Sequence, residues 1–442
     1  MIFLKSLILK YSKLFVLFIF FLNPVLTLLS THASPETYFP SNGWPRMDPE
    51  DLGFDTTKLD LINQAIINQN IGIDSIQIVR YGYLCFNKHF EYYNHSNLHN
   101  TFSVTKSVIS ALIGIANSSG MITNLDESVV NIFSNRTIQN LDTRKEAMTI
   151  RHLLEMRSGL EVNDLSVPYF IGTISYNDYL IRTNKTTMFS EEWINTLNPD
   201  NDFARLMNSS DWIQFALDKP MDAEPGTKFA YSDCITHLLS AIIREKTGMN
   251  TELFAKQYLF DPLNITEYLW WDDPSGLSFG SDGLWLTPND MLKIGYLYLN
   301  EGKWKELQII PANWVSKSIQ NFSPDMEPGY GYGYQWWIDL TNDYYFADGL
   351  GGQHIIVRPK YDLVIVFTSW DNRPGGLYSL INSIVHSIVS NPSVPDPTTA
   401  ISSSIFSTST ITDNQTSSSS IILGTAALLS IALIKRKRKR YH

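Results

Sequence analysis

One segment limits the fold of this chain more than any other: the apolar run that begins just after residue 100. Residues 101–118 carry six large aliphatic side chains, Val104, Val108, Ile109, Leu112, Ile113 and Ile115. A helix with apolar residues on almost every face is buried on most sides. We therefore predict a buried helix over 101–118, ending near Asn117 and Gly120, around which the rest of the domain packs.

The start of this helix carries a candidate nucleophile. Ser103 and Lys106 are three residues apart, so their side chains lie on one face within reach of each other. The helix N-terminus directs unpaired N–H groups and positive potential at whatever binds beside Ser103, which suits a developing oxyanion. Apolar surroundings disfavour the charged form of a lysine, so Lys106 could accept the serine proton. A lone Ser-x-x-Lys pair also arises by chance, so its position at the helix start matters.

Two later segments could reach the same site. Residues 225–233 read Pro-Gly-Thr-Lys-Phe-Ala-Tyr-Ser-Asp and precede an apolar helical segment. An ordinary helix N-cap, at Ser232 or Asp233, is the alternative interpretation of this segment. Residues 347–353 read Ala-Asp-Gly-Leu-Gly-Gly-Gln and lead into the last predicted hairpin. The alternative there is a flexible entry to a strand.

The order of predicted elements indicates an α+β fold. We interpret 34–391 as one catalytic domain, without internal repeats or a linker-like stretch. Strands at both ends with helices between them predict one antiparallel sheet from N- and C-terminal strands, flanked by helices and interrupted by a mostly helical insertion. The predicted elements are a strand pair at 75–90, helices and loops at 120–320, a strand at 332–340, a hairpin at 354–369 and a helix at 377–389.

The three motifs occur in order, 128 and then 118 residues apart counted from Ser103 to Tyr231 to Gly349. Together they resemble the class C β-lactamase-related serine hydrolases, which include penicillin-binding peptidases, esterases and 6-aminohexanoate-dimer hydrolase. The resemblance covers roughly residues 45–390, with further matching stretches at 150–160, 283–291 and 362–369. It implies a serine β-lactamase/transpeptidase-like fold.

The resemblance also implies roles for residues of the three motifs. Ser103 would be the nucleophile, Lys106 its proton acceptor, and Tyr231 the group that carries the proton to and from the leaving group. The backbone N–H groups of Ser103 and Leu350 would form an oxyanion hole for a covalent acyl-enzyme, which water then releases. The residues expected to support this site are Asp233, Gly349 and Gln353.

Two departures from the family pattern affect the expected substrate. The second motif often ends in Asn, but here it ends in Asp233, which would stabilise the charged form of Lys106 and oppose its action as a base. Tyr231 would then carry more of the proton transfer.

The third motif commonly begins with Lys, His or Trp, but here Ala347 stands there with Asp348 next. We therefore expect an ester or amide that is neutral or cationic. The alternatives are a penicillin-binding D-Ala peptidase or β-lactamase, and an inactive surface binding protein on the same fold.

The charge of the chain argues against a nucleic-acid partner. The formal net charge is −10, but the first 33 residues contribute +3 and residues 435–440 contribute +6. The remaining body carries −19, from 25 basic and 44 acidic residues. Phosphate binding requires a basic surface. We expect a small-molecule ester or amide as the substrate and no nucleic acid as a partner.

Other chemistries have weaker support. The two cysteines, Cys85 and Cys234, are too few for a Cys-based zinc cluster, and the nine histidines include no His-Glu-x-x-His pair. We expect no metal and no other cofactor. Ser278 lies in Gly-Leu-Ser-Phe-Gly, the nucleophile-elbow pattern of α/β-hydrolases, but both flanks of this motif have loop composition. Ser103 is therefore the favoured nucleophile.

The two ends of the chain predict export and membrane attachment. Residues 1–33 have the charged start and apolar run of a signal peptide. Residues 392–420 form a Ser/Thr-rich stalk, 421–434 an apolar anchor and 435–442 a basic tail. Because Lys/Arg clusters stay cytoplasmic, we expect a cell-surface protein held in the membrane by its C-terminal segment, with the tail inside. A sorting signal removed after lipid attachment and a soluble basic tail remain as alternatives.

Overall fold

The computed structural model describes residues 39–40, 43–68, 72–90, 96–164, 201–326, 328–369 and 376–391. All of them belong to one unit of the chain, Met1–Asp396. Its main feature is a seven-stranded sheet in the order β2-β1-β12-β11-β10-β9-β8, in which every neighbouring pair is antiparallel. The strands are β1 (Ile73–Arg80), β2 (Tyr83–His89), β8 (Tyr330–Tyr332), β9 (Trp337–Asp339), β10 (Tyr344–Gly349), β11 (Gln353–Arg358) and β12 (Leu363–Ser369).

Helices fill most of the chain between β2 and β8. The helices of the described chain are α2 (Thr56–Asn68), α3 (Val104–Ser118), α4 (Val129–Ile132), α5 (Thr143–Glu146), α6 (Ile150–Leu154), α9 (Asp202–Met207), α10 (Trp212–Asp218), α11 (Asp233–Thr247), α12 (Thr251–Ala255), α13 (Pro288–Leu299), α14 (Ala312–Ser318) and α15 (Gly376–His386), with short turns η1 (Lys256–Phe260) and η2 (Pro359–Tyr361). Two small sheets join β3 (His99–Asn100), β5 (Leu284–Leu286) and β4 (Leu269–Trp270), and β6 (Lys303–Trp304) and β7 (Leu307–Gln308). The predicted α+β fold, a sheet from both chain ends with a mostly helical insertion, is confirmed.

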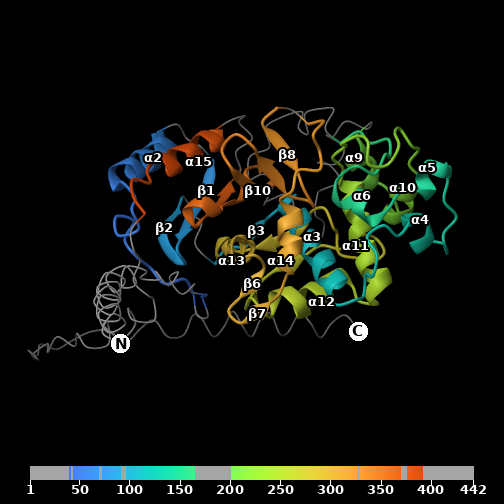
Figure 1. Cartoon of the computed structure of the whole chain (residues 1–442), viewed down its shortest axis with the longest axis horizontal. Helices are drawn as coiled ribbons and strands as arrows, with labels where there is room; N and C mark the ends of the chain where they lie inside the picture. The colour runs from blue at the N-terminus through green and yellow to red at the C-terminus, as the bar shows by residue number, and fades with distance from the viewer. Residues whose placement is uncertain are drawn as a thin grey trace, which may run out of the picture. The chain divides into compact units, whose positions relative to one another are not determined.

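Helices cover both faces of the large sheet (Figure 1). Side chains alternate between the faces: Ile76 and Ile78 of β1 pack in the core beneath α2 and α15, whereas Val79 packs in the core on the α3 and α13 side. Gly295 lets α13 lie close to the strands, because a Cβ there would come within 2.6 Å of Val364. The sheet is therefore buried on both sides and holds its edges and strand ends in fixed positions.

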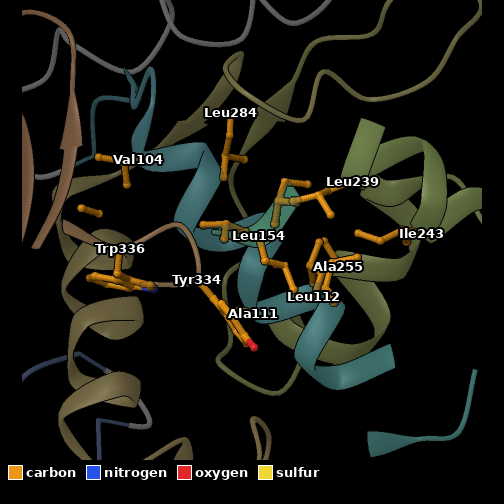
Figure 2. Close-up of a cluster of buried hydrophobic side chains, with 14 of the residues drawn as sticks. Val104, Ala111, Leu112, Leu154, Leu239, Ile243, Ala255, Leu284, Tyr334 and Trp336 are labelled. Carbon is orange, nitrogen blue, oxygen red and sulfur yellow. The ribbon is translucent and has the colours of Figure 1, made fainter. Parts of the chain in front are cut away.

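Helix α3 lies where the sheet meets the helical insertion. Every residue from Val104 to Ala116 is buried, which confirms the predicted buried helix, although its first turn starts three residues later than predicted. Figure 2 shows Leu112 packed among side chains that come from several other elements, including Leu154, Leu239 and Ile243. The core thus fixes α3, and with it the residues at its N-terminus, in the middle of the molecule.

The predicted strand at 332–340 is wrong in detail. The chain forms two short strands, β8 and β9, that are joined by a tight turn in which Gln335 has a φ of 62°. A Cβ on Gly333 would lie 1.9 Å from the carbonyl oxygen of Ser318, so the backbone of this turn packs directly against the end of α14. The Gly-Tyr alternation indicated a continuous strand because the contact with Ser318 is not visible in the local sequence.

The structure corrects the membrane assignment. In the ranges described above, no helix has both the length and the apolar character needed to cross a bilayer. The predicted membrane anchor, the membrane as a partner and the anchored cell-surface location are therefore not retained. The segments on which these predictions were based, 1–33, 392–420, 421–434 and 435–442, lie outside the described residues.

Truncating the centre of α3 should be costly. Leu112 is fully buried, so L112A should lower the free energy of unfolding by about 2–5 kcal/mol through lost burial and the cavity left behind. L61A, on the exposed side of α2 where Leu61 is 59% exposed, should cost about 0.5 kcal/mol or less. Urea denaturation of both variants checks this, and equal losses would contradict the position of α3 in the core.

Candidate active site

Ser103 is the N-cap residue of α3 and is half-buried. The residue before it, Phe102, has a φ of 48°, a left-handed conformation that is uncommon for a residue with a large side chain. The turn is held by its surroundings: the Phe102 N–H donates to Asn100 Oδ1 at 3.0 Å, and the Thr101 N–H donates to the Leu284 carbonyl at 2.8 Å. This strained turn presents the Ser103 hydroxyl at the start of a buried helix.

Lys106 lies one turn into α3 and is 1% exposed. Its Nζ lies 2.8 Å from Ser103 Oγ, 2.5 Å from Asp233 Oδ1 and 3.0 Å from the Ser281 carbonyl oxygen. An ammonium group has three N–H donors, so these acceptors satisfy all of them. Nζ also lies 4.9 Å from the centroid of the Tyr231 ring. The structure thus brings together Ser103, Lys106, Tyr231 and Asp233 from two distant motifs.

Tyr231 keeps its proton in this environment. Burial raises the pKa of Tyr231 well above its usual value, and the negative charge of Asp233 raises it further, while a hydrogen bond with Ser103 opposes the shift. The neutral phenol can therefore donate a proton, but it is poorly suited to act as the initial base. This environment argues against the part of the prediction in which Tyr231 would carry more of the proton transfer from Ser103.

The loop that carries Tyr231 is held by residues that the sequence analysis did not single out. The Ala230 N–H donates to the Met156 carbonyl at 2.8 Å, and Arg157 Nε donates to the Gly226 carbonyl at 2.9 Å. Arg157 also forms an ion pair with Asp325, whose other oxygen accepts the Phe229 N–H. Arg157 lies in the family-like stretch 150–160, and that resemblance was the one available signal for it.

Asp233, the departure from the usual Asn, forms the shortest contact of Lys106 in the site. Two further carboxyl groups that the sequence analysis missed lie around it. Asp164 accepts the Asp233 N–H at 2.9 Å, and burial together with the charge of Asp233 raises the pKa of Asp164 to about 7. Burial also raises the pKa of Asp282, next to Ser281, to about 7. The surroundings of Lys106 are therefore strongly acidic.

The third motif contacts the site through its backbone at Gly349. A Cβ on Gly349 would lie 2.3 Å from the Thr101 carbonyl oxygen, so only glycine lets the end of β10 contact the turn before Ser103. Leu350 follows and is half-buried, and the chain then turns through Gly351 with a φ of 77°. Gln353 donates to the Ser369 carbonyl and so joins β11 to β12, at the base of this turn.

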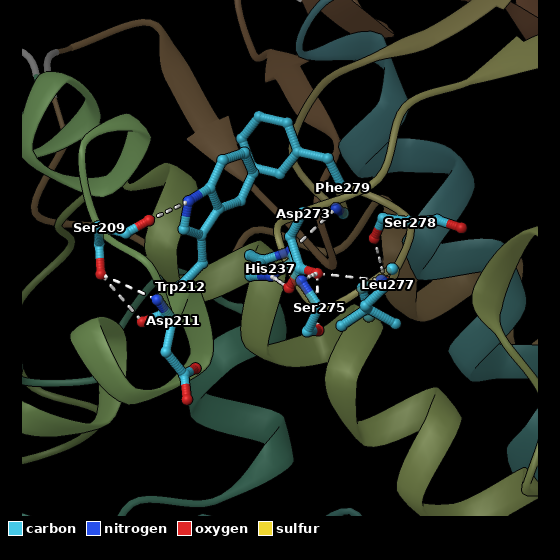
Figure 3. A network of polar contacts seen from close by, with 12 residues as sticks. Ser209, Asp211, Trp212, His237, Asp273, Ser275, Leu277, Ser278 and Phe279 are labelled. Atoms are coloured by element: carbon cyan, nitrogen blue, oxygen red, sulfur yellow. Dashed lines mark hydrogen bonds and ion pairs between the residues drawn. The ribbon is translucent and has the colours of Figure 1, made fainter. Parts of the chain in front are cut away.

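A buried polar network holds the loop that leads to Ser281, and Figure 3 shows the part of this network around His237 and Asp273. His237 of α11 contacts Asp273 with its Nε2 at 3.0 Å, and its Nδ1 accepts the Gly280 N–H at 3.3 Å. A Cβ on Gly280 would lie 2.6 Å from the Thr236 carbonyl oxygen, so the loop that carries Ser281 lies directly on α11. Asp233, at the start of the same helix, and Ser281 both accept hydrogen bonds from Lys106 Nζ.

Other candidate residues form no hydrogen bond with Ser103 or Lys106 in the described part of the chain. Ser278 is fully buried and donates to Asn250 Oδ1 at 2.8 Å, within a loop that lacks the strand-turn-helix context of a nucleophile elbow. Cys85 and Cys234 are both buried and free. In the described ranges no group of three or more His, Cys, Asp or Glu side chains has the arrangement of a metal site.

Comparisons with known proteins agree with this geometry. The Beta-lactamase family matches residues 87–380, about two thirds of the chain. A 6-aminohexanoate-dimer hydrolase from Paenarthrobacter ureafaciens is 26% identical over an alignment of 161 residues, and the match covers 32% of this chain and 40% of that protein. The chain therefore matches less than half the length of this relative.

Solved structures show the same fold. A protein assigned as a 6-aminohexanoate-dimer hydrolase from Bacillus anthracis matches with a TM-score of 0.57 and 22% identity, over 73% of this chain and 80% of that one. An octameric penicillin-binding protein homologue from Pyrococcus abyssi matches with a TM-score of 0.56 and 18% identity, over 75% and 77%. The resemblance seen in the sequence and the serine β-lactamase/transpeptidase-like fold are both confirmed.

Replacing Asp233 by the more usual residue tests its effect on Lys106. D233N removes the anion that favours the ammonium form, so we expect the acid limb of the kcat/KM profile for p-nitrophenyl acetate to move about one pH unit or more to lower pH. D222N, which removes a carboxylate from an exposed ion pair on the same loop, should leave the profile in place. An unmoved acid limb in D233N would show that Asp233 does not control the protonation of Lys106.

Asp282 should make stability depend on pH. Burial raises the pKa of Asp282 in the folded state to about 7. The contribution of Asp282 to the free energy of unfolding is therefore fully present at low pH and is lost as the pH rises from about 4 to about 7. D282N should therefore be more stable than wild type at pH 8, by at most about 4 kcal/mol, with a much smaller difference at pH 4.5.

Asp273 serves as the control for Asp282, because its pKa is lowered in the folded state and that of Asp282 is raised. Burial would raise its pKa, but hydrogen bonds from His237, Ser275 and Leu277 outweigh burial and lower the pKa to about 2. Both test pH values lie above that value, so D273N should destabilise the protein at both. Urea denaturation at the two pH values measures these effects, and a D282N effect that is the same at pH 4.5 and pH 8 would contradict the assignment.

Proposed function

The chain belongs to the beta-lactamase family of serine hydrolases, and we propose that it cleaves an ester or amide bond through an acyl-enzyme on Ser103. The observation that carries this proposal is the position of Lys106 Nζ, 2.8 Å from Ser103 Oγ at the start of α3. A nucleophile within hydrogen-bond reach of a base that other groups orient is the geometry that covalent catalysis requires.

In the proposed reaction Ser103 Oγ attacks the substrate carbonyl carbon and its proton moves to Lys106. This step requires neutral Lys106, and the contact with Asp233 opposes it because a carboxylate at this distance stabilises the ammonium form. Ser103 is half-buried and Lys106 is 1% exposed, so a substrate can approach the serine but not the lysine.

The oxyanion would be stabilised at the junction of α3 and β10. The backbone N–H groups of Ser103 and Leu350 are the proposed donors, and each preorganised donor contributes about 3 kcal/mol at the transition state. The close contact between Gly349 and Thr101 supports this assignment, because it brings β10 against the turn that carries the nucleophile.

Tyr231 is the proposed donor to the leaving group. Its high pKa keeps the phenol protonated at neutral pH, and its hydroxyl interacts with Ser103. The phenol gives its proton to the departing oxygen or nitrogen, and the proton that Lys106 took from Ser103 then restores the phenol. Lys106 Nζ lies 4.9 Å from the centroid of the Tyr231 ring. Water then attacks the acyl-enzyme carbonyl, releases the acid and returns the proton to Ser103 Oγ.

A neutral or cationic substrate fits the third motif best. Ala347 is buried and uncharged, at the position where related enzymes commonly carry a cation, and the next residue is Asp348. Lys106, the buried cation of the site, is already bound to Asp233. A substrate carboxylate would therefore find little compensation for leaving water, which disfavours penicillins and D-Ala-D-Ala termini.

Labelling with a fluorophosphonate probe tests the assigned nucleophile. Wild-type protein should be labelled, and S103A should lose labelling and the turnover of p-nitrophenyl acetate by at least about 10³-fold. S278A is the matched control, since Ser278 lies in the competing motif, and it should be labelled like the wild type. Labelling of S103A at the wild-type level, or no labelling of wild type, would refute the hydrolase proposal.

A further inference from the structure

Asp348 is a charged residue at the edge of the site that the proposed reaction does not use. It lies on β10 directly before Gly349, and its side chain is 36% exposed although its neighbours Phe346 and Ala347 are buried. Strand alternation puts Asp348 on the same face as Phe346. Across the strand pair, His354 of β11 is its register partner. The carboxylate at this position is partly exposed and stands on a strand that is paired with β11.

Asp348 acts electrostatically on the reacting groups. Its negative charge contributes to raising the pKa of Tyr231 and of Tyr332. Burial raises the pKa of Asp348 itself, and electrostatic interactions with His354 and then Lys106 oppose that increase. These mutual effects mean that the Asp348 carboxylate lies within Coulombic range of the tyrosine and the lysine that would process the substrate.

The described part of the protein supplies no full cation to this carboxylate. All three donors of Lys106 are directed to Ser103, Asp233 and Ser281. In the described ranges no Lys or Arg nitrogen lies within 4 Å of the Asp348 oxygens, and the residue that does face them is His354, with Nδ1 at 3.3 Å. Burial lowers the pKa of His354, so its ring is uncharged near neutral pH.

Aromatic rings extend the same face toward the catalytic tyrosine. Trp337, which is half-buried, stacks on Phe346 at 6.4 Å between ring centroids and lies 5.5 Å from the Tyr231 ring. Ring faces attract cations, and a carboxylate beside them adds direct charge complementarity. A surface of this composition favours a positively charged group over a neutral one of equal size.

We propose that Asp348 selects the substrate by binding a positively charged group on it, so that the preferred substrate is an ester or amide that carries an ammonium group near the scissile carbonyl. This inference rests on the proposed function, because it concerns the substrate of the Ser103 reaction. Asp348 is a specificity-determining residue in this scheme: the substrate cation supplies the charge that the described protein does not.

Two thioesters of equal shape test the proposal. Acetylthiocholine carries a quaternary ammonium, and S-(3,3-dimethylbutyl) thioacetate has carbon in place of that nitrogen. Wild-type protein should show a kcat/KM for the charged thioester about tenfold or more above that for the neutral one. The ratio should fall as NaCl increases, because salt screens a half-exposed charge pair. The isosteric variant D348N should bring the ratio close to one.

A second variant separates local recognition from overall charge. D343N makes the same change in charge at an exposed position in the turn that leads into β10, and it should keep both the activity and the wild-type ratio. A wild-type ratio near one, or a ratio in D348N equal to that of the wild type, would overturn the role of Asp348. If the neutral thioester is hydrolysed in a Ser103-dependent way without discrimination, the Asp348 proposal alone fails. If S103A hydrolyses both thioesters as fast as the wild type, the proposed function fails as well.

Discussion

The contact between Lys106 and Asp233 is the interaction on which the rest of the site depends. It buries a cation and an anion in a region that the hydrophobic core surrounds, and a charge left unpaired there would destabilise the fold strongly. The lysine comes from α3, the aspartate from the start of α11, and the third acceptor, Ser281, from a loop clamped onto α11. The protein must therefore assemble all three segments correctly before this ion pair can form.

The acidic surroundings of this pair connect the chemistry with the charge of the whole chain. Burial raises the pKa of Asp164 and of Asp282 to about 7. Asp164 accepts the Asp233 N–H, and Asp282 follows Ser281, whose carbonyl accepts from Lys106. Each deprotonation there favours the ammonium form of the lysine. An excess of acid over base is thus present in the interior next to the nucleophile and not only on the solvated surface.

The sequence predicted what local patterns encode. An apolar run long enough to define α3 and the strand pair predicted at 75–90 both depend on neighbours along the chain, and both were found. The Arg157–Asp325 ion pair and the Asp164–Asp233 contact join residues 168 and 69 positions apart. No periodicity identifies such partners, because they are determined only when the fold brings them together. The turn at Gly333 was missed for the same reason.

The backbone contact between Gly349 and Thr101 has a consequence for how this protein could diversify. The position of the serine turn is set by main-chain atoms, whereas the side chains at Ala347 and Asp348 project from the same strand without carrying that contact. The side chains at these two positions can therefore change the substrate preference without moving the serine that cleaves the bond. Exchanging two side chains next to this backbone contact offers laboratory evolution a short mutational path to new substrates, with the hydrolytic machinery left in place.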